Sequence, residues 1–185
     1  MPSRRVALRL LGAGMVGLGV GCSTIEKELN LKNEDDTTLK TAYLDPWRPG
    51  AKRLQIDLPK DSEAKMDTRD GAAIFYITNK TTGESMGIYV GGYPRLISEQ
   101  TAIAKTGRQK GKINGKDMEW VTWKTEEAPR DEYHCEAIVS GIFPPPAKPT
   151  GLDSLAPLVH IFIVASSNKR RELFQRAAST LQLEK

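Results

Sequence analysis

The sequence LVHIFIVA, residues 158–165, decides the fold because it is apolar on both of the faces that a strand would present. A strand with one solvated face alternates apolar and polar residues, whereas a strand covered on both sides reads as an almost continuous apolar run. We therefore expect this stretch to be a central strand of a sheet. Its one titratable residue is His160, which we interpret as a core histidine with a hydrogen-bonded ring nitrogen.

A C-terminal helix is predicted directly after this strand. Asn168 is its expected N-cap, and apolar residues recur beyond it at helical spacing. The expected apolar stripe consists of Leu173, Phe174, Ala177, Ala178 and Leu181. A helix with one apolar face most simply packs across one face of the sheet.

Upstream segments carry further strand signals. Residues 54–58 (LQIDL) alternate strictly, which places their three apolar side chains on one face, and Pro59 ends the strand. Residues 72–78 (AAIFYIT) and 85–90 (SMGIYV) flank a short polar connection containing a glycine, which predicts a β-hairpin. The polar residues 60–71 are expected to form a loop.

The middle of the chain adds one helix and two strands. Residues 97–105 have a helical composition and predict one short helix. Asn114-Gly115 predicts a tight turn, after which residues 117–125 (DMEWVTWKT) should form a strand. Residues 133–143 predict a further strand. Together the pattern predicts an α+β domain, with an antiparallel sheet of five to six strands packed by the C-terminal helix and one further short helix.

One group of titratable residues suggests chemistry. Glu132, His134 and Glu136 share a face of the predicted strand, where they could line an acid/base site or a ligand surface; a solvent-facing polar row explains them equally well. Cys135 points to the other face, so it cannot pair with His134 as nucleophile and base, and we interpret it as a small buried hydrophobe. The sequence predicts no catalytic set, no metal site and no cofactor motif.

Aromatic and proline residues give weaker indications. Trp120 and Trp123 lie three residues apart in a predicted strand, so one should face the core and the other should face outward. An outward tryptophan near Tyr89 or Tyr93 could form a ligand or partner surface, but we favour packing under the helix. The proline-rich residues 143–149 are expected to form a loop, because proline lacks the amide donor that a sheet requires.

The N-terminus has the features of an export signal. Three arginines precede an uncharged run over residues 10–21, which is shorter than the roughly 20 residues that a membrane-spanning helix needs. A removable signal peptide over residues 1–21 is therefore expected, and an uncleaved membrane anchor is the alternative. This leader holds no acidic residue, so its removal lowers the formal net charge from +4 to +1 and takes away the main argument for a nucleic-acid partner.

The end of the leader, Gly19-Val20-Gly21-Cys22, resembles the lipobox of bacterial lipoproteins, although Gly19 stands where the family usually has leucine. The resemblance implies cleavage between Gly21 and Cys22 and a lipid thioether on Cys22. Two or three acyl chains on this residue would hold the chain firmly at a membrane. Ser23 is similar to the residue found in lipoproteins of the outer membrane, which implies the periplasmic face of that membrane if the organism has two.

The start of the leader, SRRVALR over residues 3–9, resembles a twin-arginine export signal with Arg4 and Arg5 as the arginine pair. An ordinary secretory n-region also often contains paired arginines, so both export routes remain open.

The chain is thus predicted to contain a signal peptide (1–21), a lipidated cysteine with a polar tether (22–50) and a single α+β domain (51–185). We interpret it as an exported, membrane-anchored lipoprotein of the cell envelope with a non-catalytic binding or assembly role. Its expected partners are the membrane, through the lipid, and an envelope protein or ligand. The alternative is an envelope enzyme that uses scattered carboxylates and His134.

Overall fold

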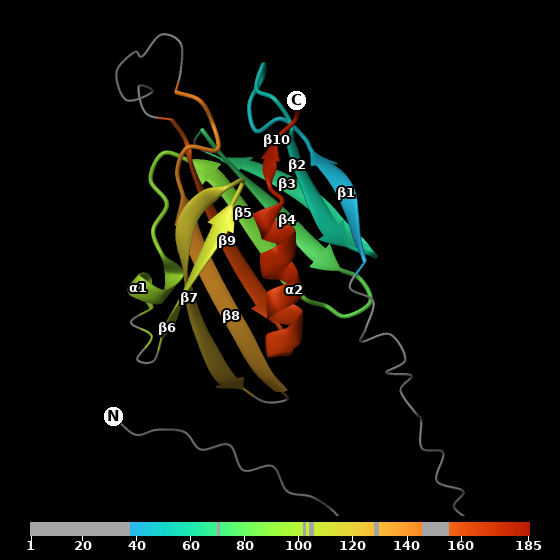
Figure 1. The fold of residues 1–185 in the computed structure, drawn as a ribbon, viewed down its shortest axis with the longest axis vertical. Coiled ribbons are helices and arrows are strands. Elements are labelled where there is room, and N and C mark those ends of the chain that lie inside the picture. The colour runs from blue at the N-terminus through green and yellow to red at the C-terminus, as the bar shows by residue number, and fades with distance from the viewer. Residues whose placement is uncertain (1–37, 70, 102, 104–105, 128–129, 146–155) are drawn as a thin grey trace, which may run out of the picture. The chain divides into compact units, whose positions relative to one another are not determined.

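The fold is built around a seven-stranded antiparallel sheet, seen in a computed structural model that describes residues 38–69, 71–101, 103, 106–127, 130–145 and 156–185 (Figure 1). From one edge to the other its strands are β3 (Ser62–Arg69), β4 (Ala72–Asn79), β5 (Ser85–Gly91), β9 (Leu158–Ala165), β8 (Arg130–Val139), β7 (Lys116–Glu127) and β6 (Gly107–Ile113). The predicted central strand is confirmed, since β9 lies between β5 and β8.

A second sheet has three strands, β1 (Leu39–Leu44), β2 (Leu54–Pro59) and β10 (Gln182–Leu183), with β2 in the middle. The helices are α1 (Ile97–Gln100) and α2 (Asn168–Ser179). The α+β class is confirmed. The expected number of five to six strands is wrong, because the described residues form sheets of seven and three strands.

The strands that the sequence did not predict are exposed or short. β3 falls in residues 60–71, which we expected to form a loop. It is an edge strand, and because its residues are mostly exposed its sequence does not alternate between apolar and polar residues. β6, at the opposite edge, is equally polar. Charged side chains on an edge strand oppose pairing with other chains, which is why such strands lack the usual hydrophobic signal. β1 lies inside the segment that we expected to be a tether, 22–50.

One face of the seven-stranded sheet is covered by α2 and by the three-stranded sheet, and we call it the inner face. A single core forms between these layers. Its largest fully buried side chains include Leu54, Ile56, Phe75, Ile77, Met86, Ile88, Ile161, Ile163, Phe174 and Leu181. The alternation in β2 is confirmed, because Leu54, Ile56 and Leu58 are all buried. The apolar stripe predicted for the C-terminal helix is buried as well.

The N-cap of helix α2 lies one residue earlier than expected. Ser167 is the N-cap, and its Oγ accepts a hydrogen bond from the amide of Arg170 at 3.3 Å. Asn168 is the first helical residue, and its Nδ2 instead donates to Glu172 Oε1 at 2.7 Å. A serine and an asparagine in sequence are both good caps, so composition alone did not separate them.

The hairpin of β4 and β5 is confirmed, and the side chain of Asn79 organises its turn. Asn79 Oδ1 accepts hydrogen bonds from the amides of Thr81 and Thr82, each at 3.0 Å, and Nδ2 donates to the carbonyl of Lys60 at 2.8 Å. An asparagine that bonds the backbone two residues further on replaces part of the turn's own hydrogen bonding. The turn is therefore also tied to the start of β3.

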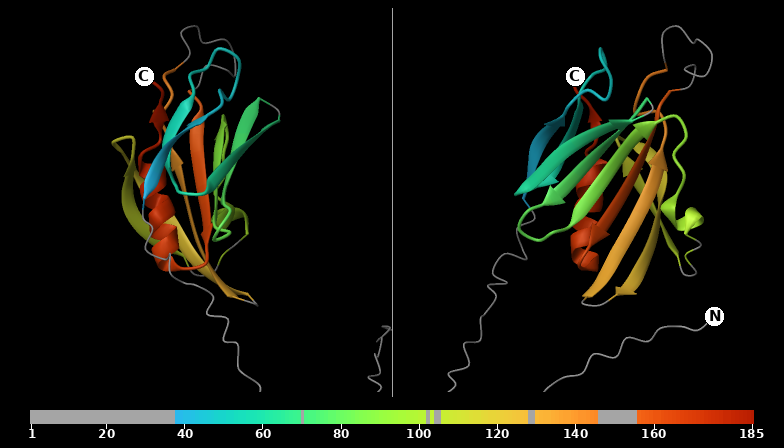
Figure 2. Two further views of the ribbon diagram at one scale, coloured as in Figure 1. Left: turned by 90° about the vertical axis from the view of Figure 1, so that its right-hand side faces the viewer. Right: turned by 180° about the vertical axis from the view of Figure 1, so that it is seen from behind.

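The other face of the seven-stranded sheet, the outer face, carries α1. Figure 2 shows α1 and α2 on opposite sides of this sheet. The outer-face residues of β8 alternate with inner-face Cys135 and Ala137, and they include the predicted row of Glu132, His134 and Glu136. The outer face is therefore the part of the described chain on which the candidate site residues lie.

Candidate functional site

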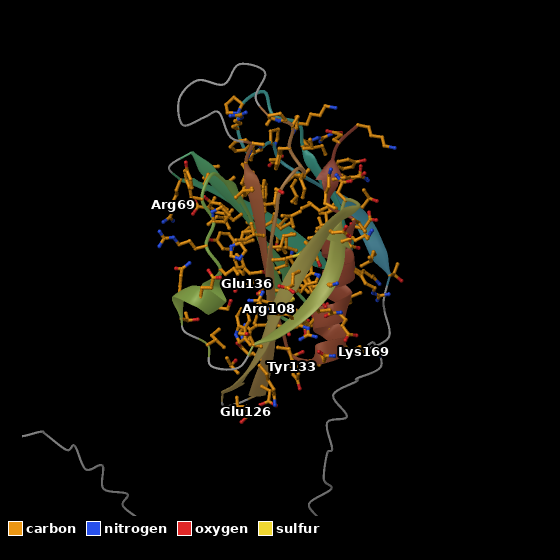
Figure 3. All side chains as sticks on the ribbon, turned by 60° about the vertical axis from the view of Figure 1, so that its left-hand side comes forward. Arg69, Arg108, Glu126, Tyr133, Glu136 and Lys169 are labelled. Atoms are coloured by element: carbon orange, nitrogen blue, oxygen red, sulfur yellow. The ribbon has the colours of Figure 1, made fainter. Side chains whose placement is uncertain are left out.

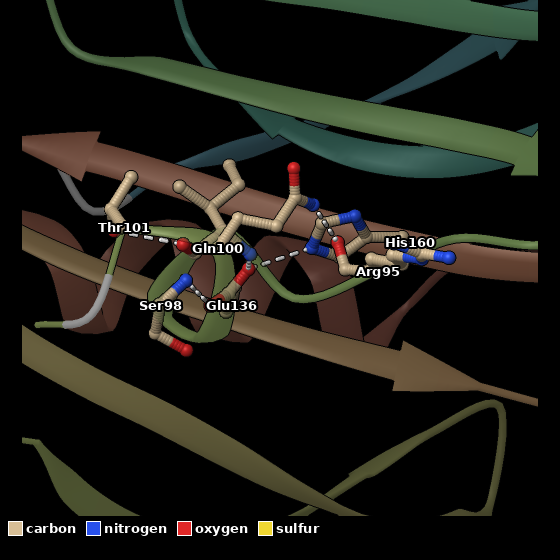
Figure 4. Close-up of polar contacts among 7 residues, drawn as sticks. Arg95, Ser98, Gln100, Thr101, Glu136 and His160 are labelled. Atoms are coloured by element: carbon tan, nitrogen blue, oxygen red, sulfur yellow. Dashed lines mark hydrogen bonds and ion pairs between the residues drawn. The ribbon is translucent and has the colours of Figure 1, made fainter.

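The most strongly organised polar group on the outer face is the carboxylate of Glu136. It lies beside α1 (Figure 3), and its side chain is 0% exposed. Oε1 accepts a hydrogen bond from the amide of Ser98 at 2.7 Å, and Oε2 accepts one from the amide of Ile97 at 2.7 Å. Oε2 also lies 2.9 Å from Nε2 of His160 on the neighbouring strand β9. Both oxygens of Glu136 are thus engaged (Figure 4).

Glu136 does for α1 what an N-cap side chain usually does. The residue at the N-cap position is Leu96, which makes no side-chain cap hydrogen bond. The first amides of a helix have no partner within it, so they need an acceptor from elsewhere. The carboxylate supplied by β8 satisfies two of them, and it therefore fixes this four-residue helix to the sheet.

The environment of Glu136 keeps it ionised. Burial alone would raise its pKa, but the hydrogen bonds from His160, Ser98 and Ile97 outweigh burial and lower the pKa below its usual range. An ionised carboxylate only accepts hydrogen bonds, so Nε2 of His160 carries the proton between the two groups. The sequence-based interpretation of His160 as a hydrogen-bonded core histidine is confirmed, since it is buried and bonded to Glu136.

The structure divides the predicted row of three residues into two separate groups. Nε2 of His134 lies 3.4 Å from Oε2 of Glu132 and shares a hydrogen bond of 2.9 Å with Oγ1 of Thr125. The imidazole ring also stacks on Trp123, with ring centroids 5.1 Å apart. Glu136, two residues along, bonds α1 and His160 instead. The interpretation of Glu136 as part of a solvent-facing row is wrong, because α1 covers it.

This arrangement is suited to holding structure rather than to moving protons. A general base needs a lone pair that a substrate can reach, and the buried oxygens of Glu136 already accept three hydrogen bonds. Within the described ranges, no three His, Cys, Asp or Glu side chains are grouped so that they could hold a metal ion.

The pairing of Glu136 with His160 was missed by sequence analysis, although a signal existed. His160 is the one titratable residue in LVHIFIVA, and Glu136 directly precedes the apolar residues 137–139 of β8. Buried charges are normally paired, so two such residues in one sheet are candidates for each other. The two amides of α1 that donate to Glu136 lie nearly forty residues before it in the chain, so no local sequence pattern indicated this contact.

Cys135 behaves as predicted. It is a free and fully buried thiol on the inner face. Burial, the largest influence, raises its pKa to about 12, so the reactive thiolate is scarcely populated at neutral pH.

The two tryptophans of β7 are buried, which excludes the alternative of an exposed tryptophan surface. Trp120 and Trp123 do face opposite sides of β7, but both are buried, so neither forms an exposed surface. Trp123 is covered on the outer face, where His134 stacks on it. The exposed aromatic residues are tyrosines instead, with Tyr76 46% exposed and Tyr93 70% exposed.

Three aromatic side chains form what we call the aromatic platform, Tyr76 on β4, Tyr89 on β5 and Phe162 on β9. The register aligns Tyr76 and Phe162 on either side of Gly87. A Cβ atom at Gly87 would overlap the ring of Phe162, so this ring lies against the backbone of β5. Tyr89 lies against Gly91 in the same way. The two glycines therefore let both rings lie low on the outer face, while Tyr76 stays exposed.

The export residues lie outside the described part of the chain, namely Arg4, Arg5, Gly21 and Cys22. In the part that the structure describes, neither helix has the length and apolar character needed to cross a membrane. Comparison of the chain with protein-family models, curated proteins and solved structures gave no match.

Proposed function

We propose that this chain is an exported lipoprotein, held at a membrane of the cell envelope by lipid on Cys22, whose domain binds an envelope protein or ligand through the aromatic platform. The observation that carries the binding role is a group of adjacent aromatic side chains on the outer face, of which Tyr76 is exposed and Tyr89 and Phe162 are partly exposed. Tyrosine rings offer a large contact area at a low entropic cost, together with a hydroxyl for hydrogen bonding.

The platform has a firm border, which supports its use as a binding surface. Phe162 lies opposite Glu136 in the register of β9 and β8, and its ring centroid is 5.9 Å from that of His160. Glu136 holds α1 above this point, so α1 borders the platform on the β8 side. A surface held in place before binding loses less conformational entropy when a partner docks.

The export half of this proposal depends on Cys22 and is tested by metabolic labelling. Cells grown with a palmitate analogue should label the wild-type chain and should not label the Cys22→Ala variant. Labelling that persists in Cys22→Ala would overturn the lipoprotein assignment while leaving the binding surface untouched.

The binding half is tested by site-specific photocrosslinking in the producing organism. A photoreactive phenylalanine analogue at position 76 should yield adducts of one discrete mass. Tyr43 is the matched control, because it is 52% exposed but lies on β1 in the other sheet. Equal adducts from positions 76 and 43, or none from position 76, would contradict the role of the platform.

A further inference from the structure

The seven-stranded sheet ends in two edge strands, β3 and β6, whose charges are arranged differently. β6 carries three positive charges and no negative one, at Arg108, Lys110 and Lys112. Like charges that face each other destabilise a strand pair, so β6 opposes pairing with a second copy of itself. β3 instead carries two charges of each sign in alternation, and its net charge is zero. The free edge of β3 therefore lacks this electrostatic protection.

The backbone of β3 directs half of its polar groups toward this edge. In an antiparallel pair, alternate residues point both their N–H and their C=O at the neighbouring strand, and the residues between them point these groups away. Asp61 lies opposite Lys80, one step before the first pair of the ladder, and its carbonyl accepts a hydrogen bond from the Lys80 amide at 3.0 Å. The odd-numbered residues of β3 therefore bond to β4. The backbone groups that face the free edge, where no other described strand pairs, belong to Ser62, Ala64, Met66 and Thr68.

The side chains of β3 divide between the two faces of the sheet. Met66 lies opposite the buried Phe75 and so shares the side of the inner face, yet it is 40% exposed because it stands at the edge. A large apolar side chain beside free backbone groups favours pairing with another strand. The charged side chains lie on the side of the outer face, and they are Glu63, Lys65, Asp67 and Arg69.

We propose that two copies of the chain associate through their β3 strands, paired antiparallel about a twofold axis that passes between the two Met66 residues. In this register Met66 faces Met66 of the second copy, and Ala64 faces Thr68. All three residues point their backbone groups at the free edge, so the two strands form a regular hydrogen-bonded ladder. The two exposed Met66 side chains also bury apolar area against each other.

The order of the charges selects this register. With the axis at Met66, Glu63 faces Arg69 of the second copy and Lys65 faces Asp67, so every charged residue of β3 meets the opposite sign. Moving the axis one residue back makes Lys65 face Lys65 and Glu63 face Asp67. Moving it one residue forward makes Asp67 face Asp67 and Lys65 face Arg69. Both neighbouring registers therefore place like charges opposite each other, which destabilises a strand pair.

The ion pairs that these charges make within one copy do not prevent the exchange of partners. Asp67 Oδ2 lies 3.0 Å from Arg69 Nε, and Glu63 Oε2 lies 3.0 Å from Lys80 Nζ, with all four side chains at least 40% exposed. Ion pairs between exposed side chains contribute little to stability. The β3 edge shares no residue with the aromatic platform, so this proposal stands apart from the proposed function.

The register itself is tested by cysteine crosslinking of the full chain. Met66→Cys should form a disulfide-linked dimer on mild oxidation, since facing residues of a hydrogen-bonded pair have Cα atoms about 5.5 Å apart. Ala64→Cys alone should not, because its two copies lie four residues apart along the strands, about 13 Å, but it should crosslink with Thr68→Cys in a mixture. The wild-type chain, whose Cys135 is buried, is the control. Crosslinking of Ala64→Cys with itself as efficient as that of Met66→Cys would overturn the register.

The association is tested by sedimentation velocity of the full chain, purified in a large excess of detergent. One pair of strands is a small interface, so the wild-type chain should dimerise with a Kd between about 1 µM and 1 mM.

Charge reversal gives this measurement its specificity. Lys65→Glu and Asp67→Lys each place like charges opposite each other at two positions, so each variant alone should dimerise about tenfold or more weakly than wild type. An equimolar mixture of the two should associate as tightly as wild type, because each copy then faces the opposite charge on the other. Lys110→Glu makes the same change on the exposed edge strand β6, and its affinity should equal wild type. A wild-type chain that stays monomeric up to about 1 mM, unchanged affinity in both single variants, or a mixture no tighter than either variant alone would overturn the proposal.

Discussion

Replacing Glu136 with glutamine should destabilise the domain locally, because no orientation of the new amide satisfies every donor around it. In one orientation the NH₂ group replaces Oε1 and faces the amide of Ser98; in the other it replaces Oε2 and faces the amide of Ile97. His160 can change tautomer and accept a hydrogen bond, but a backbone N–H cannot. At least one buried amide therefore loses its acceptor, at a cost of about 1–3 kcal/mol.

This cost should appear as a lower melting temperature. For a domain of this size each kcal/mol corresponds to about 2–4 °C, so a cost of about 1–3 kcal/mol should lower the melting temperature of Glu136→Gln by about 2–12 °C at pH 7. Amide hydrogen exchange at Ile97 and Ser98 should accelerate more than exchange elsewhere on the sheet. Glu99→Gln is the matched control, since Glu99 is an exposed residue of the same helix. Its effect should stay within about 0.5 kcal/mol.

The stability difference between wild type and Glu136→Gln should depend on pH. The pKa of Glu136 is lowered in the folded chain, so its contribution is complete above the unfolded carboxyl pKa of about 4.3 and is lost as the pH falls through the folded value. The difference in stability between wild type and Glu136→Gln should be constant from about pH 6 to 8 and should narrow below about pH 4. Equal melting temperatures at pH 7, or a difference that grows on acidification, would refute the role assigned to this carboxylate.

Further predictions concern packing, capping and thiol reactivity. Gly87→Ala should cost about 1–3 kcal/mol, because its Cβ overlaps the ring of Phe162, and the double variant with Phe162→Ala should cost less than the sum of the single variants in denaturant unfolding. Ser167→Ala should lower the free energy of unfolding by about 1 kcal/mol, and Asn168→Ala should lower it clearly less. Thermal melts rank the two variants, and the reverse order would contradict Ser167 as the cap. In the Cys22→Ala variant, Cys135 should resist a thiol reagent at pH 8 and react fully in denaturant. Rapid labelling of the folded chain would contradict the burial and the raised pKa of Cys135.

Elements that bury a face could be predicted from the sequence. The strand at 158–165, the β4–β5 hairpin and the stripe of α2 each place apolar residues at the period of their structure, and the structure confirms all three. β3 and β6 could not be predicted in this way, because edge strands with exposed, charged residues lack that period. What defines them is pairing with a neighbour.

The candidate site could be predicted only in part. Sequence analysis placed Glu136 on the correct face of the correct strand, and it identified His160 as a core histidine. It could not show that these two residues meet, because their contact depends on the pairing of β8 with β9.

The place of β9 in the sheet also dictates how the domain assembles. Strands β3, β4 and β5 follow one another in the chain, as do β6, β7 and β8, so each trio can pair while synthesis continues. β9 emerges afterwards and joins the trios at β5 and β8. Until then those two strands are open edges flanked by apolar side chains, the kind of surface that aggregates or recruits a chaperone. Without residues 158–165 no strand joins β5 to β8, so the seven-stranded sheet cannot be completed before LVHIFIVA has been synthesised.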